Sequence, residues 1–385
     1  MRRCAVLPAL FLIVIMVIAG CSNQQEQKKS ERSKATVKEL LIGAVLPLTG
    51  DAAPWGIPPK KGAQLAADEI SQKGNLKIKI DFQDTTCQPA RGISAFRQLA
   101  DVYKIPVVMG AVCSSVTLAI APVAEKERVV LISPASTSPK ISSAGDYIFR
   151  VVPSDALRGR IFARYLFKKK GLRKVAILYI NNEGGVGNRD SFKNEFTSLG
   201  GKVVLEEAYP PQSRDLRAQL TKIKNSNVDG VIAVSYPDDT ILIMKQAAEL
   251  KVGKPFFYQT EAVEDPSVLK QAGAAANGAI YILPAPAEGE AARAFAQAYE
   301  KRYGTKPELF AAEAYDIIHL VVKAAEANGG RLEAEKVRDY LYTVKSYHGA
   351  SGIISFDSNG DVIKPMAIKI IENGKPRLLE IVGLE

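Results

Sequence analysis

The chain has 385 residues, of which 47% are hydrophobic and 24% are charged, a composition that is ordinary for a globular protein. Its formal net charge is +10, but lysines and arginines are scattered among acidic residues. No basic stripe interleaved with aromatic residues occurs, so we expect a solvated basic surface and no nucleic-acid partner.

The first residues have the features of an export signal. Arg2 and Arg3 precede a short apolar run, and small residues stand directly before Cys21 in IAGCS. We therefore predict that residues 1–20 are a signal peptide, too short for a comfortable membrane span. IAGCS also matches the lipobox of bacterial lipoproteins, in which the signal is cut before a cysteine that is then acylated. A plain signal peptide with an incidental cysteine is the alternative.

Residues 21–39 are predicted to be a lipidated cysteine followed by a flexible tether, because the segment is polar, mixed in charge and poor in apolar residues. The protein would then be exported and held by lipid on the outer side of a membrane. The remaining body is longer than one hydrophobic core usually supports, which indicates two lobes.

The body begins with alternating strands and helices. The predicted strands are 40–48, 77–84, 106–112 and 128–134, and the predicted helices are 59–72, 90–103 and 117–127. The pattern then restarts, with strands at 174–180, 202–209, 229–236, 254–260 and 278–284 and helices at 188–200 and 215–226. Strands separated by helices predict a parallel sheet with helices on both faces, so two such runs predict two α/β lobes.

The last third of the chain is mixed. Helices are predicted at 290–304, 311–329 and 332–344, and residues 352–371 are predicted to form a hairpin that turns on 357–360.

Cysteine and histidine usage restricts the chemistry. Cys87 and Cys113 remain after export, and two cysteines in an oxidising compartment indicate one disulfide, with two free thiols as the alternative. The only histidines are His319 and His348, so we expect no histidine-based metal site. No other feature of the sequence calls for a cofactor.

Side chains suited to a zwitterion follow several strands, where ligands bind in open α/β sheets. Ser114 and Thr137 can donate to a carboxylate, helped by free N–H groups at a helix start. Glu261 can accept from an ammonium, and Trp55 and Tyr236 can enclose an apolar side chain. Each residue also has an ordinary structural interpretation, because serine and threonine cap helices, tryptophan packs and glutamate lies at surfaces.

The sequence gives little support for an enzyme. The glycine-containing segment 182–191 lacks both G-x-G-x-x-G and the Lys–Ser/Thr ending of a P-loop. No G-x-S-x-G elbow occurs, and the two histidines stand in unrelated contexts. We therefore expect a protein that is not an enzyme and has no catalytic residues.

Residues 40–385 resemble the substrate-binding proteins of branched-chain amino-acid (Leu/Ile/Val) ABC transporters. The resemblance rests on motifs in order and at similar spacing: IGAVLPLTGDAAPWG, GAQLAADEI, QDTTCQPARG, GAVCSS, ISPASTSP, FRVVPSD and GIISFDSNGD. It implies the type I periplasmic-binding fold, in which two similar lobes, each an α/β sandwich around a parallel sheet, are joined by three crossovers. The implied lobes are 40–154 plus 286–367 and 155–285 plus 368–385.

The resemblance also implies a ligand site between the lobes and a disulfide between Cys87 and Cys113. The implied ligand-binding residues are Trp55, Ser114, Ala135, Thr137, Tyr236, Glu261 and Phe310. The disulfide would hold the loop of Ser114 rigid before ligand arrives.

The function that the resemblance implies is capture of an amino acid, branched-chain or otherwise apolar, and delivery to the permease subunits of an ABC importer. We expect a monomer. This sequence has Gly184 where the family usually has tyrosine, and Trp55 where leucine binders often have tyrosine, so the pocket shape differs. Alternatives are an aromatic or aliphatic acid without an amine as the ligand, or a receptor that senses the same ligands.

Overall fold

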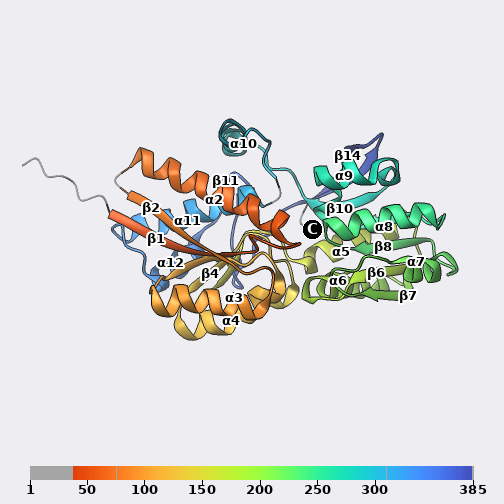
Figure 1. The fold of residues 1–385 in the computed structure, drawn as a ribbon, viewed down its shortest axis with the longest axis horizontal. Helices are drawn as coiled ribbons and strands as arrows, with labels where there is room; N and C mark the ends of the chain where they lie inside the picture. The colour runs from red at the N-terminus through yellow and green to blue at the C-terminus, as the bar shows by residue number, and fades with distance from the viewer. Residues whose placement is uncertain (1–37, 75, 309, 384–385) are drawn as a thin grey trace, which may run out of the picture. The chain divides into compact units, whose positions relative to one another are not determined.

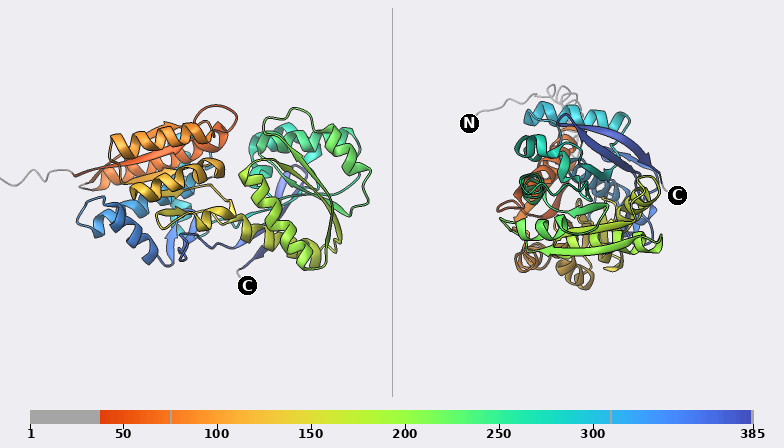
Figure 2. Two further views of the ribbon diagram at one scale, coloured as in Figure 1. Left: turned by 90° about the horizontal axis from the view of Figure 1, so that it is seen from below. Right: turned by 90° about the vertical axis from the view of Figure 1, so that its right-hand side faces the viewer.

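The computed structural model describes residues 38–74, 76–308 and 310–383 (Figure 1). The predicted signal peptide, the acylated Cys21 and nearly all of the tether lie outside the described residues. The described body contains two large β-sheets with helices packed on both faces of each, which confirms the predicted α/β class with two lobes (Figures 1 and 2).

The first lobe is built on a five-stranded sheet with the order β2-β1-β3-β4-β5. Its strands are β1 (Lys38–Leu46), β2 (Leu76–Asp84), β3 (Val107–Gly110), β4 (Val130–Ser133) and β5 (Ile148–Arg150). The neighbours from β1 to β5 pair in parallel, so their carboxyl ends meet at one edge. In this lobe the polar side chains that follow β3 and β4 are therefore brought together.

Helices cover both faces of the five-stranded sheet. They are α2 (Ala53–Lys73), α3 (Pro89–Arg97), the π-helix η1 (Gln98–Val102), α4 (Ser114–Glu127), η2 (Pro139–Ser143), α11 (Ala311–Ala327) and α12 (Ala334–Thr343). A further helix, α10 (Glu290–Tyr303), packs against α2 and α11 and not on the sheet. Apolar residues of α2, α11 and α12 share one buried core with the sheet, and those of α3 and α4 share the other. The alternation of side chains along each strand supplies both cores.

The second lobe contains a seven-stranded sheet with the order β14-β13-β10-β9-β8-β6-β7. Its strands are β6 (Lys174–Ile180), β7 (Lys202–Tyr209), β8 (Gly230–Val234), β9 (Phe256–Tyr258), β10 (Ile280–Pro284), β13 (Met366–Glu372) and β14 (Lys375–Val382). The strands β6 to β10 pair in parallel, whereas β13 and β14 add an antiparallel edge. The sheet is thus mixed and not purely parallel.

The helices of the second lobe also lie on two faces. They are α5 (Asp155–Lys168), α6 (Glu183–Ser198), α7 (Arg217–Lys224), α8 (Pro237–Glu249), η3 (Glu261–Glu264), α9 (Pro266–Ala272) and η4 (Gly273–Ala276). Apolar residues of α5 and α6 pack in one core, and those of α7, α8 and α9 pack in the other. The helices α5, α8 and α9 were not among the predicted elements.

Within the described chain, three segments pass between the lobes: 151–154 before α5, 285–289 before α10, and 355–365 before β13. The late helices α10, α11 and α12 therefore return to the first lobe, and β13 and β14 return to the second. The lobe boundaries given above remain predictions at the level of single residues.

The predicted hairpin over 352–371 is wrong. Its first part is β12 (Gly352–Ile354), which pairs with β11 (Tyr347–Gly349), and its second part is β13, which pairs with β14. A single bridge between Phe356 and Val362 closes the 357–360 turn. The long hairpin turns instead on Asn373–Gly374, where both residues have positive φ. Asn-Gly is the strongest short hairpin signal, because both residues tolerate that conformation.

No helix among the described residues is long and apolar enough to cross a membrane. Within the same residues, no group of three or more histidine, cysteine, aspartate or glutamate side chains is arranged to hold a metal ion.

Candidate functional site

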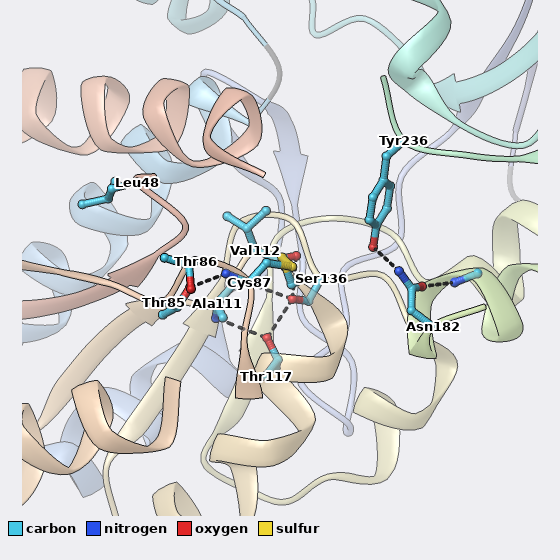
Figure 3. Close-up of a disulfide and its surroundings, with 12 residues drawn as sticks. Leu48, Thr85, Thr86, Cys87, Ala111, Val112, Thr117, Ser136, Asn182 and Tyr236 are labelled. Atoms are coloured by element: carbon cyan, nitrogen blue, oxygen red, sulfur yellow. Dashed lines mark hydrogen bonds between the residues drawn. A yellow bond between two sulfur atoms is a disulfide. The ribbon is translucent and has the colours of Figure 1, made fainter. Parts of the chain in front are cut away.

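The loops after β3 and β4 are tied together by buried hydroxyl groups. The Ser133 Oγ donates to the carbonyl of Ala111 at 2.6 Å, and the Ser136 Oγ donates to the same carbonyl at 2.9 Å. The hydroxyls of Thr117 and Ser136 lie 2.7 Å apart (Figure 3). Several of the clustered hydroxyls therefore fix the backbone of the loops and are not available to a ligand.

Two of the predicted hydroxyl residues line a cavity. Ser114 is the first residue of α4, where backbone N–H groups are free of helical partners, and its Oγ accepts from the Ser138 N–H at 3.2 Å. Thr137 and Ala135 line the same cavity from the loop after β4. Hydroxyls beside a helix N-terminus form a suitable site for a carboxylate.

A disulfide joins Cys87 to Cys113, the residue directly before Ser114. Cys87 lies in the loop between β2 and α3, so the bond connects that loop to the start of α4 (Figure 3). The predicted pairing is present in the structure.

The aromatic walls come from both lobes. Trp55 lies in the first turn of α2, which begins earlier than the predicted residue 59. Its ring is 4.4 Å from that of Tyr236 and 6.0 Å from that of Phe310, measured between centroids. Trp55 and Tyr236 line the cavity, whereas Phe310 packs behind Trp55 and is not among the lining residues.

Tyr236 is held by its surroundings. Its hydroxyl accepts from the Asn182 Nδ2 at 3.2 Å, and Asn182 in turn caps α6 by accepting from the Gly185 N–H at 2.8 Å (Figure 3). Burial raises the pKa of Tyr236 to about 12, so the phenol stays protonated at neutral pH.

Glu261 is the first residue of η3, separated from the end of β9 by two residues, lines the cavity and is 5% exposed. Its Oε2 accepts from the Arg158 Nη1 at 2.6 Å, and both side chains are almost fully buried. The sequence predicted Glu261 as an acceptor for a ligand amine, but in this structure an arginine of the chain occupies one of its oxygens.

The sequence patterns did not predict Arg158 as a site residue. It lies one turn into α5, after Ser154, whose side chain accepts from the Ala156 N–H. The serine–aspartate pair after β5 is a recognisable helix start, and would have placed Arg158 near the sheet edge. Asn188 and Gln259 also line the cavity and were not predicted.

Asp155 is fully buried beside Arg158, with 3.7 Å between its Oδ1 and the Arg158 Nε. Burial raises the pKa of Asp155 to about 6, although the nearby Arg158 guanidinium opposes the effect. Its backbone N–H donates to the carbonyl of Thr137 at 2.8 Å, which links α5 to the loop after β4.

Gly184 lies where the two lobes meet at the cavity. A Cβ placed on it would be 3.5 Å from the Tyr236 hydroxyl and 4.0 Å from the Ser114 Oγ. The absence of a side chain at Gly184 therefore leaves space between Ser114 of the first lobe and Tyr236 of the second.

The cavity has a volume of about 40 Å³, enough for a few water molecules. Small-molecule sites are usually several times larger, so a ligand requires Trp55 or the lobes to move apart. A larger hollow of about 730 Å³ lies on the other side of α5. It contains none of the predicted residues and is lined by the basic side chains Arg160, Arg164, Lys168 and Lys169.

The small cavity is the better candidate because unpartnered polar atoms converge there. Among the described residues, the Trp55 Nε1, the Gln259 Oε1, and the Nε and Nη2 of Arg158 are buried without a hydrogen-bond partner. Buried polar groups in folded proteins nearly always have partners, so a cluster without them indicates a ligand site.

Comparisons with known proteins agree with this architecture. A family model described as periplasmic binding protein matches residues 39–375. A leucine-, isoleucine-, valine-, threonine- and alanine-binding protein of Pseudomonas aeruginosa is 25% identical over 356 residues, which cover 91% of this chain and 92% of the relative.

Solved structures are similar over nearly their whole length. A branched-chain amino acid transporter substrate-binding protein of Streptococcus pneumoniae, in complex with isoleucine, has a TM-score of 0.81 and 29% identity, covering 90% of this chain and 99% of that one. A solute-binding protein of an ABC transporter from Rhodopseudomonas palustris, in complex with 3,4-dihydroxybenzoic acid, has a TM-score of 0.80 and 25% identity, covering 89% and 96%.

Proposed function

The chain belongs to the periplasmic binding protein family, and on that premise we propose that it captures a small carboxylate-bearing ligand for an ABC importer. The ligand is held in the cleft between the lobes and delivered to the membrane permease. The observation that carries this proposal is the cavity at Ser114, Ala135 and Thr137, where hydroxyls stand beside the N-terminus of α4. Such a site stabilises a carboxylate through directed N–H and O–H donors.

An amino acid is the first candidate ligand. Glu261 lines the cavity on the side of the second lobe, where it can accept from an ammonium group, and Trp55 and Tyr236 supply apolar walls. The names of the bacterial relatives support the same class.

An organic acid without an amine is the second candidate, and one specific observation favours it. Arg158 already donates to Glu261 at 2.6 Å, so a ligand ammonium would have to share that carboxylate with a guanidinium. The relative that holds a hydroxylated benzoic acid has the same fold.

We also propose that Cys21 carries lipid and anchors the protein outside the cytoplasm, close to the permease. The lipobox sequence supports this proposal. Replacement Cys21→Ser is expected to move the protein from the membrane fraction to the soluble fraction, and continued membrane attachment would contradict the anchor.

A thermal-shift screen of the full-length protein tests the function. The panel contains the twenty amino acids and aromatic and aliphatic carboxylates without an amine. A ligand at 100 times its Kd adds about 2.7 kcal/mol to the free energy of unfolding, which raises the midpoint measurably. A shift by amino acids alone identifies the first candidate, and a shift by amine-free acids identifies the second. The absence of any shift from a folded protein would contradict the proposal.

A further inference from the structure

We propose that Arg158 is a ligand-binding residue that makes the cleft select a ligand with two carboxylate groups. This inference rests on the proposed function and names the class of substrate more narrowly. The two carboxylates would bind at opposite sides of one cavity, the first at Ser114 and Thr137 and the second at the free edge of the Arg158 guanidinium.

The first step of the argument is the incomplete pairing of Arg158. Its side chain is 3% exposed and lines the cavity. The Nη1 is bound to Glu261, whereas the Nε and Nη2 have no hydrogen-bond partner. Asp155 is the other acidic group beside it, but the 3.7 Å between its Oδ1 and the Nε is longer than a hydrogen bond.

The two unpartnered atoms form one edge of the guanidinium, which is the edge that binds a carboxylate in a bidentate manner. The same chain contains an example. The Arg150 Nε and Nη2 donate to the two oxygens of Asp361 at 2.6 and 2.8 Å. Arg158 presents the equivalent edge with no carboxylate hydrogen-bonded to it, since the buried Asp155 carboxylate stands 3.7 Å from the Nε.

An apolar ligand side chain does not suit this surface. Packing a leucine-like group against Arg158 would exclude water from a charged donor edge and provide no acceptor, which is strongly unfavourable. A second carboxylate supplies two acceptors and a compensating charge. The unpartnered Trp55 Nε1 is a further donor beside the same cavity.

Two kinds of ligand share this chemistry: an amino dicarboxylic acid, whose amine could reach the remaining oxygen of Glu261, and a dicarboxylate without an amine. Isothermal titration calorimetry on the full-length protein compares matched pairs that differ in one carboxylate. The pairs are L-glutamate with L-glutamine, L-aspartate with L-asparagine, and succinate with succinamate. L-leucine and benzoate represent apolar ligands with a single carboxylate.

At least one two-carboxylate ligand is expected to bind at least 10-fold more tightly than its monoamide. Arg158→Gln is expected to lower the affinity for that ligand by about 30-fold or more and to abolish the preference for the acid over the amide. Arg158→Lys, which keeps the charge but loses the planar fork, is expected to give an intermediate loss. Arg160→Gln, an exposed arginine on the same helix, is the matched control and is expected to bind as the wild type does.

The pair that shows tighter binding of the acid tells whether the ligand carries an amine. Glutamate and aspartate have an amine, and succinate does not. Tight binding of leucine or benzoate without binding of any two-carboxylate ligand would overturn the inference and leave the proposed function intact. No binding of any carboxylate by the folded protein would contradict both. If Arg158→Gln does not fold, the comparison of acid with amide in the wild-type protein decides the question alone.

Discussion

Arg158 and Glu261 form a buried ion pair at 2.6 Å, so removal of the Glu261 charge leaves Arg158 with only the more distant Asp155 at 3.7 Å. Glu261→Gln is therefore expected to lower the free energy of unfolding by about 3–5 kcal/mol, measured by urea denaturation. The double variant Arg158→Gln/Glu261→Gln is expected to recover part of that loss at pH 5, where neither member of the pair is charged and burial keeps the remaining Asp155 protonated. Wild-type stability in the single variant would show that the pair is not maintained in solution.

Gly184 and Gly185 are neighbours in the first turn of α6 with opposite tolerance of a side chain. A Cβ on Gly184 would make ordinary contacts, the nearest being 3.5 Å from the Tyr236 hydroxyl. A Cβ on Gly185 would lie 1.9 Å from the backbone oxygen of Ile180. Gly184→Ala is expected to leave thermal stability unchanged or slightly higher, because alanine favours helix.

Gly185→Ala is expected to cost about 1–3 kcal/mol, because the backbone must shift to admit the methyl group. Circular dichroism melting of both variants makes the comparison, with each serving as the control for the other. Equal stability of the two would contradict the described start of α6.

Asp155 gives the site a predicted pH dependence. The folded-state pKa of about 6 lies above the usual value of 3.8, so the folded protein holds this proton more tightly than the unfolded chain. The contribution of protonated Asp155 to the free energy of unfolding is fully present below pH 3.8 and is lost as the pH rises through 6.

From pH 4 to pH 7, the unfolding free energy of the wild type is expected to fall by roughly 2–3 kcal/mol relative to that of Asp155→Asn. Urea denaturation of both proteins at several pH values measures the difference. A difference that stays constant over this range would mean that Asp155 titrates as an ordinary carboxyl.

At the scale of elements, the disulfide stabilises the start of α4. The bond closes a loop with a sequence separation of 26 between Cys87 and Cys113, directly beside Ser114. The variant with both cysteines changed to serine is expected to lose about 3–4 kcal/mol of unfolding free energy, by the loop-entropy model. Ligand affinity should fall as well, because Ser114 is held less firmly. Full stability and affinity would show that the hydroxyl network fixes the loop without the bond.

The sequence predicted most elements because their periodicity is local. The strands β6 and β7 occur at the predicted residues 174–180 and 202–209. The hairpin of residues 352–371 was predicted wrongly, because the pairing of β13 with β10 is a long-range contact that a short window does not contain. The Asn373–Gly374 turn between β13 and β14 is the stronger local hairpin signal.

At the scale of the whole molecule, family-like motifs placed six of the seven predicted ligand residues at one cavity. The pairing of Arg158 with Glu261 could not be predicted from the sequence. The two residues are 103 positions apart, and arginine is most often a surface residue. The proposed preference for two carboxylates over one depends on that contact. It could therefore be inferred only from the structure.

The chain contains one tryptophan, and the structure places it in the cleft, with its ring 4.4 Å from that of Tyr236. Tryptophan fluorescence of the full-length protein therefore reports on this site alone. During titration with a carboxylate that binds by calorimetry, the emission is expected to change with the same Kd, since ligand entry must separate Trp55 from Tyr236. Calorimetric binding with no change in tryptophan emission would place the ligand elsewhere and contradict the central claim.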